Sequence, residues 1–201
     1  MGYRTIIFDL GNVLVNFSHQ KMFSQIASLT GHTIEHIEDL LVTHRMGYQY
    51  ERGLLSSEEI YEIFQKDAPK TFEIDEFLDA ATSIFHPKKE METLVETLKR
   101  KGYQLILISN TSRPHYTHIA QNYPFLSQFD HIILSYEVGA IKPEKEIFEY
   151  ALKKGKTTPS SSFFIDDLLE NVLAAEHLGI RSHHFTSPSH LMEDLVKHGI
   201  L

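Results

Sequence analysis

Residues 6–16 of the chain, IIFDLGNVLVN, place an aspartate directly after a short apolar run. The run at 6–8 is typical of a buried strand, and Gly11 with Asn12 is typical of the turn that follows one. Asp9 therefore stands at the carboxyl end of a strand, which is where ligands bind in open parallel sheets. A glycine stands two positions later, where a second acid could have been expected.

Four further runs have the composition of buried strands, and helical patterns separate them. The runs are QLILIS (104–109), HIILS (131–135), SFFID (162–166) and RSHHF (181–185). The segments between them carry apolar residues at helical spacing and end in glycines that suit a C-terminal cap, namely Gly102, Gly155 and Gly179. Because strands and helices alternate, the sequence predicts an α/β fold, Rossmann-like, with a parallel sheet that has helices on both faces.

The segment between residues 17 and 88 breaks this alternation, because it carries helical patterns only. Ser18 suits an N-cap, Gly31 suits a helix stop, and Ser56 with Glu59 suits a capping box. The sequence therefore predicts a small helical cap inserted after the first strand. The α/β core would comprise 1–16 and 89–201, and the cap 17–88.

Size and composition exclude several classes of protein. The 201 residues allow one core with a small added lobe. The formal charge of −8 argues against a sequence-independent nucleic-acid binder, which needs a surplus of Lys and Arg. The lack of cysteine excludes disulfides, thiolate metal sites and cysteine nucleophiles. No apolar run approaches the ~20 residues of a membrane-spanning helix, and none forms a signal-peptide core. We expect a cytoplasmic protein without nucleic-acid or membrane partners, and a monomer.

Polar side chains gather at the carboxyl ends of the expected strands. They are Asp9, Ser109, Asn110, Asp166 and Asp167, and Lys142 comes just after the third strand. Carboxylates from two strands are the hard oxygen ligands that Mg²⁺ prefers, and a backbone carbonyl near Gly11 can add a third oxygen. A hydroxyl, an amide and an ammonium group can hold phosphate oxygens. In this setting Asp9 can serve as a nucleophile that forms an aspartyl-phosphate intermediate.

Four stretches resemble the motifs of the haloacid dehalogenase (HAD) superfamily of phosphohydrolases, in order and over the whole chain. They are FDLGNVL (8–14), LISNTS (107–112), GAIKPEKEIF (139–148) and FFIDDLLENV (163–172). FDLGN, SNTSRPH (109–115) and YERGLLSSEEI (50–60) look closest to the bacterial α-D-glucose-1-phosphate phosphatase subgroup. The phosphatase lobe of epoxide hydrolases looks like a more distant relative. The resemblance implies a HAD core with a helical cap in place of residues 17–88.

The resemblance also implies a role for each polar residue. Asp9 would be the nucleophile and a Mg²⁺ ligand, the carbonyl of Gly11 would be a second ligand, and Asp167 would complete the site. Asp166 would act through water or orient the groups around the metal.

At the phosphate, Ser109 would hold an oxygen with Asn110 beside it, and Lys142 would neutralise the phosphoryl charge. The segment HRMGYQYERG, residues 44–53, would be the cap loop that meets the substrate. At least half of its larger side chains should pack rather than touch substrate; these are Arg45, Tyr48, Tyr50 and Arg52.

One residue departs from the family's pattern. The family carries a second Asp two positions after the nucleophile, which protonates the leaving group and later activates water, but Gly11 stands here. A general acid contributes about 10²–10⁴-fold, so we expect slow turnover on ordinary alcohol leaving groups and accumulation of a phospho-enzyme. An anomeric hydroxyl departs readily and suffers less, which fits a sugar phosphate such as glucose 1-phosphate.

The sequence leaves two other functions open beside a Mg²⁺-dependent phosphatase of a small phosphorylated metabolite. A metal-independent 2-haloacid dehalogenase also uses an Asp nucleophile, but it lacks the acidic pair found here at 166–167. A non-catalytic phosphate-binding protein could have kept the fold without the acid. Among the histidines, His183 and His184 should face opposite sides of a strand, so they cannot readily share a metal. Surface positions are expected for this pair and for His115 and His118.

Overall fold

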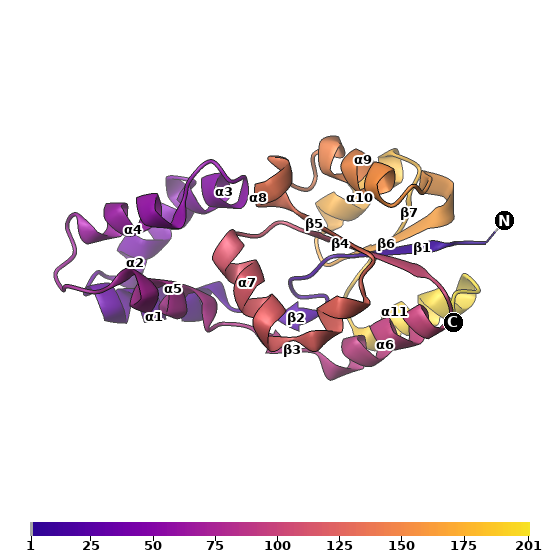
Figure 1. Cartoon of the computed structure of the whole chain (residues 1–201), viewed down its shortest axis with the longest axis horizontal. Coiled ribbons are helices and arrows are strands. Elements are labelled where there is room, and N and C mark those ends of the chain that lie inside the picture. The colour runs from indigo at the N-terminus through magenta and orange to yellow at the C-terminus, as the bar shows by residue number, and fades with distance from the viewer. Residues whose placement is uncertain (1) are drawn as a thin grey trace.

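Residues 2–201, which the computed structural model describes, form a five-stranded parallel sheet in the order β5-β4-β1-β6-β7 (Figure 1). The strands are β1 (Thr5–Phe8), β4 (Gln104–Ser109), β5 (His131–Leu134), β6 (Ser162–Asp166) and β7 (Arg181–His184). In the central strand, Thr5 lies opposite Gln104 on one side and Ser162 on the other. Because the strands are parallel, their carboxyl ends meet at one edge, and the predicted α/β fold is confirmed.

Helices cover both faces of the sheet, as expected (Figure 1). Successive residues of β1 point to opposite faces, so Ile6 and Phe8 join one buried cluster and Ile7 joins the other. The first cluster includes residues of α6 (Lys89–Arg100), α7 (Arg113–Asn122) and α11 (Pro188–Lys197). The second includes residues of α9 (Lys145–Lys154) and α10 (Leu169–His177). Shorter turns are α8 (Ser135–Val138), η2 (Pro124–Gln128) and η3 (Pro159–Ser161).

Helices from the segment after β1 lie beyond the carboxyl edge of the sheet and pack around their own apolar core (Figure 1). They are α1 (His19–Thr30), α2 (Ile34–Glu38), the π-helical η1 (Asp39–Thr43), α3 (Met46–Glu51), α4 (Ser57–Gln65) and α5 (Ile74–Thr82). The Ser18 side chain caps α1, Gly31 ends it at a φ of +82°, and Ser56 with Glu59 forms the expected capping box. We propose 17–88 as the bounds of this cap.

Two features of the cap differ from expectation. The chain enters and leaves it through a pair of two-residue antiparallel strands, β2 (Val15–Asn16) and β3 (His86–Pro87), which are too short to leave a sequence pattern. The expectation of a loop over 44–53 was wrong, because α3 spans Met46–Glu51. Met46 and Tyr50, four residues apart, both pack into the cap core, which is a helical spacing. No helix within 2–201 combines the length and the apolar character needed to cross a membrane.

Candidate active site

The carboxyl edge of the sheet brings together the charged residues that the sequence placed at strand ends. Carboxylate oxygens of Asp9, Asp166 and Asp167 lie within 4.8 Å of one another. The Lys142 ammonium lies 2.5 Å from Asp9 Oδ1 and 2.6 Å from Asp166 Oδ2, and its side chain is only 2% exposed. A buried lysine is thereby fixed between two buried carboxylates.

Hydrogen bonds from neighbouring elements hold this cluster in place. Asp166 is fully buried and accepts bonds from the Leu168 amide at 2.8 Å and from the Asn171 side chain of α10 at 3.0 Å. The Asn12 side chain donates to Asp167 Oδ2 at 3.1 Å. The carboxylates therefore have fixed orientations before any ligand arrives.

Burial governs the protonation of the cluster. Burial and the neighbouring Asp166 raise the pKa of Asp9 to about 7, against the opposing effect of Lys142. Burial alone would lower the pKa of Lys142, but Asp9 and Asp166 outweigh it and the pKa is raised. One ammonium among three carboxylates leaves an excess of negative charge. This all-oxygen donor set fits a hard divalent cation such as Mg²⁺.

Ser109 and Asn110 follow at the end of β4, with different surroundings. Both line a recess of about 50 Å³ that also reaches Gly11. The Asn110 amide, however, binds the backbone of Lys142, donating to its carbonyl at 2.9 Å and accepting from its N–H at 2.8 Å. The side chain of Asn110 therefore positions Lys142, and Ser109 offers its hydroxyl without such a bond to the Lys142 backbone.

The Phe17 ring occupies the space that a side chain at position 11 would need. A Cβ placed on Gly11 would stand 2.7 Å from a ring carbon of Phe17, which lies at the start of the cap segment. A side chain at 11 would have to displace that aromatic ring. Gly11 therefore leaves room for the Phe17 ring at the point where the cap segment begins.

Glu51, the last residue of α3, lines the same recess as Gly11 and Ser109. Burial raises its pKa to about 7, and the charge of Lys142 opposes that shift. The sequence places Glu51 in YERGLLSSEEI and in the segment expected to meet the substrate, but it predicted no individual role for this residue. The available signal was an acidic residue between Tyr50 and Arg52, in the segment expected to meet the substrate.

Two histidines lie elsewhere than expected. His115 is not a surface residue: it lines the recess, its Nε2 lies 3.1 Å from the Ala81 carbonyl, and burial lowers its pKa to about 4. His183 is also buried, and its Nδ1 lies 2.9 Å from Asp194, whereas His184 is exposed on the other side of β7. The cap helix α5 packs over His115 and α11 packs over His183, and strand or helix periodicity alone could not place these rings.

A larger pocket of about 320 Å³ lies between the cap and the core. His19, Glu51 and His115 line both this pocket and the recess, so the two cavities share one boundary. Its remaining wall is mainly apolar and comes from cap helices; the members include Met22, Phe23, Ile26, Leu41, Val42, Ile60 and Phe77. Of the four larger cap side chains considered from the sequence, three line it, and these are Arg45, Tyr48 and Tyr50. Arg52 instead reaches the core.

Comparison with known proteins gives consistent relatives. The profile of the haloacid dehalogenase-like hydrolase family matches residues 3–179. A sesquiterpene phosphatase of Aspergillus oryzae is 27% identical over 92% of this chain and 90% of that protein. A D-ribitol-5-phosphate phosphatase of Bacteroides thetaiotaomicron is 25% identical over 89% of this chain and 90% of that protein. A HAD family enzyme of the same bacterium, solved with magnesium and inorganic phosphate, is 26% identical with a TM-score of 0.84, over 94% of this chain and 99% of that one.

Proposed function

The chain belongs to the haloacid dehalogenase-like hydrolase family, and from that premise we propose that it is a Mg²⁺-dependent phosphatase with Asp9 as its nucleophile. The observation that carries this proposal is the cluster of Asp9, Lys142 and the acidic pair at the strand ends. The phosphatases among its relatives, and the neighbour solved with magnesium and phosphate, support the same activity and cofactor.

The residues divide the chemistry between them. The Asp9 carboxylate attacks phosphorus, while Lys142 and Ser109 hold the phosphoryl oxygens. Asp9, Asp167 and the Gly11 carbonyl would hold Mg²⁺, which supplies charge neutralisation for the phosphoryl group when bound. Asp166, held by Leu168 and Asn171, fixes the position of Lys142 and the shell around the metal.

The lining of the larger pocket supports an apolar leaving group. Each hydroxyl of a sugar needs a hydrogen-bond partner when it is buried, and a wall of aliphatic and phenyl groups supplies few. The sequence resemblance favoured glucose 1-phosphate, but the side chains of the cap favour a monoester of an apolar alcohol. The sesquiterpene phosphatase, similar over nearly its whole length, supports this substrate class. We therefore propose an isoprenoid-like organic phosphate as substrate.

Phosphate release from geranyl phosphate, ribitol 5-phosphate and glucose 1-phosphate tests this proposal, with Mg²⁺ and with EDTA. We expect release that depends on Mg²⁺ and kcat/KM at least about tenfold higher for geranyl phosphate, the discrimination available to an apolar pocket. A preference for either sugar or polyol phosphate would overturn the substrate class. Release that persists in EDTA would overturn the metal-dependent mechanism.

The other two functions make different predictions in the same assay. A haloacid dehalogenase would release halide from 2-chloropropionate without metal, whereas the clustered carboxylates of Asp9, Asp166 and Asp167 suit a cation-dependent reaction. A non-catalytic phosphate-binding protein would release nothing from any ester. Measurement of chloride beside phosphate separates the three functions.

A further inference from the structure

We propose that Glu51, supplied by the cap, transfers the proton for which position 11 has no side chain. This inference rests on the proposed phosphatase function and adds a catalytic residue to it. It begins from the position of the carboxyl group. Glu51 lines the recess that contains Gly11 and Ser109 and also lines the larger apolar pocket. If Ser109 holds the phosphoryl group at the recess and the apolar pocket takes the leaving group, as the proposed function requires, the bond to be cleaved lies where the two cavities meet.

The tripeptide Glu51–Arg52–Gly53 is held against the core by contacts from each of its residues. The Ser135 hydroxyl donates to the Glu51 carbonyl at 2.6 Å. The Ser135 hydroxyl oxygen in turn accepts a hydrogen bond from the Thr111 amide at 2.9 Å. Arg52 donates to the Gly139 carbonyl at 3.0 Å and pairs with Glu144.

Gly53 completes this anchor. Its φ is +71°, and a Cβ there would stand 2.4 Å from the Tyr136 carbonyl oxygen. The end of α3 therefore lies directly against α8, and the two helices are neighbours in Figure 1. The sequence Glu-Arg-Gly thus fixes a cap residue relative to the phosphoryl site, which a proton donor requires.

The surroundings of Glu51 suit proton transfer in both directions. Burial holds its pKa near 7, so that both protonation states are accessible at neutral pH. The charged and titratable groups around it are Lys142, which favours the carboxylate, the imidazoles of His19 and His115, and, in the larger pocket, Arg45, Tyr48 and Tyr50. Burial lowers the pKa of both imidazoles, so neither supplies a proton at neutral pH. The carboxyl group is therefore the acid of the recess.

The two half-reactions balance as follows. An Asp9 oxygen forms a bond to phosphorus while the ester P–O bond breaks, and the Glu51 proton passes to the departing oxygen, which leaves as a neutral alcohol. A water oxygen then attacks phosphorus while the bond to Asp9 breaks, and one proton of that water passes to the Glu51 carboxylate. Inorganic phosphate leaves, and both carboxyl groups return to their starting states.

Glu51→Gln separates these half-reactions when two leaving groups are compared. On geranyl phosphate, whose alkoxide needs a proton, we expect kcat to fall about 10²–10⁴-fold. On 4-nitrophenyl phosphate, whose leaving group needs none, the first half-reaction should persist while the second slows. The variant should then give a burst of nitrophenolate, stoichiometric with enzyme, followed by slow turnover and a trapped aspartyl-phosphate. Glu62→Gln, an exposed carboxylate on α4, is the matched control and should behave like the native protein.

The outcomes distinguish the two proposals. Unchanged turnover in Glu51→Gln, or equal losses on both esters without a burst, would overturn the role of Glu51 as proton donor. Native activity in Asp9→Asn would overturn the phosphatase mechanism itself. Gly53→Ala offers a second approach, because it shifts the anchored tripeptide without changing the carboxyl group. We expect a loss on geranyl phosphate that exceeds the loss on 4-nitrophenyl phosphate.

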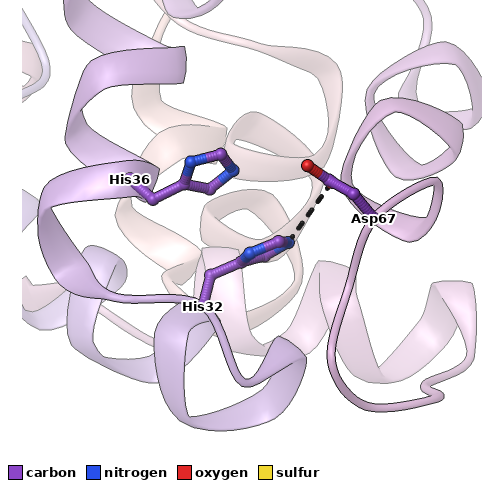
Figure 2. A group of neighbouring side chains, drawn as sticks. All are labelled: His32, His36 and Asp67. Carbon is purple, nitrogen blue, oxygen red and sulfur yellow. Dashed lines mark ion pairs between the residues drawn. The ribbon is translucent and has the colours of Figure 1, made fainter.

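An independent group of side chains on the cap points to a second site. Figure 2 shows His32, His36 and Asp67 directed toward one another, from the connection between α1 and α2, from α2 and from the connection between α4 and α5. Their ligand atoms lie within 4.8 Å, and His32 Nε2 is 3.7 Å from Asp67 Oδ1. None of the three lines the catalytic cavities.

The burial of the two rings argues for a ligand at this site. Within residues 2–201, the His36 Nε2 atom is buried without a hydrogen-bond partner, and the His32 side chain is only 8% exposed. His32 Nε2 has only a long contact of 3.4 Å to the Phe64 carbonyl besides Asp67. Two imidazoles and a carboxylate form a common donor set for Zn²⁺, whose ligands stand about 3.3 Å apart in a tetrahedron. We infer that the cap binds one Zn²⁺ here, with water as the fourth ligand.

Calorimetric titration of the metal-free protein with Zn²⁺, in excess Mg²⁺ to occupy the catalytic carboxylates, tests this site. We expect one Zn²⁺ per chain and a higher melting temperature. His36→Gln should abolish both, and His44→Gln, whose exposed ring pairs with Asp39 alone, should retain both. Equal Zn²⁺ binding in native protein and His36→Gln, or no binding by the native protein, would overturn this inference.

Discussion

Two regions of the proposed active site, a charged floor at the edge of the sheet and an apolar wall from the cap, differ in origin and in chemistry. The floor comes from strand ends and from the turn before α9, and its buried Lys142 contacts both Asp9 and Asp166. The wall comes from inserted helices and presents mainly apolar groups such as Phe23 and Ile26. The sheet thus carries the reaction, and the cap surrounds the part of the substrate that varies. Glu51 is where the two regions meet.

The largest expected effect comes from the floor. Asp9→Asn should lower the rate of phosphate release roughly 10⁴-fold or more, as losses of nucleophiles do in other enzymes. The free energy of unfolding should not fall, because burial disfavours the Asp9 carboxylate and the amide carries no charge. Phosphate release and thermal unfolding of the metal-free protein measure both quantities. A destabilised variant would show that this charge cluster supports the fold as well as the reaction.

A substitution in the cap core should have the opposite effects, a large loss of stability with little loss of activity. Phe64 is fully buried among cap side chains, and its ring lies 5.1 Å from that of Phe77. Phe64→Ala should lower the free energy of unfolding by about 3–5 kcal/mol through lost contacts and a cavity. At temperatures well below unfolding, kcat should stay within a few-fold of the native value, because Phe64 does not line the cavities. Urea unfolding beside kinetics on 4-nitrophenyl phosphate checks this, and a collapse of kcat would show that cap and floor are not separable.

The same contrast explains what the sequence could predict. Asp9, Ser109 and Asp166 each follow a recognisable apolar run, and parallel strands bring their carboxyl ends to one edge whatever the details of packing. Periodicity therefore predicted the floor. Lys142 belongs to no strand, and only its place after the third run suggested its position.

The wall could not be predicted in this way, because it depends on how helices turn against one another. The family resemblance implied a cap loop over 44–53, yet Met46–Glu51 within this segment forms α3. The position of Glu51 depends on contacts that Ser135 and Tyr136 make with the end of that helix, and these residues are far from it in the sequence. His115 looked exposed on its own helix, and it is the packing of the cap that buries it. Contacts between distant segments leave no local pattern.

An intermediate effect is expected at the boundary of the two regions, from His115. Burial holds its pKa at about 4, so below the ordinary value of 6.5 the unfolded chain binds a proton that the folded chain does not. Between pH 6.5 and 4 this difference should remove roughly 3 kcal/mol of stability.

The matched comparison is His115→Gln, which lacks that proton. Asp9 and Glu51, whose pKa values are raised, act in the opposite direction and do so in both proteins. The difference in unfolding free energy between native protein and variant should therefore shrink or reverse as the pH falls from 6.5 to 4. Urea unfolding at several pH values measures it. Parallel pH profiles would mean that His115 is protonated in the folded protein and faces solvent.

The smallest effect tests the wall directly. Leu41 is half-buried and lines the apolar pocket, so Leu41→Ala should lower kcat/KM for geranyl phosphate about tenfold and leave glucose 1-phosphate unaffected. Leu54→Ala is the matched control, because that side chain is 65% exposed and lies outside this pocket. If only Leu41→Ala lowers the ratio of kcat/KM for geranyl phosphate to kcat/KM for glucose 1-phosphate, the wall selects by apolar contact. If both ratios stay unchanged, selection lies at the floor, and the division between reacting strands and selecting helices fails for this protein.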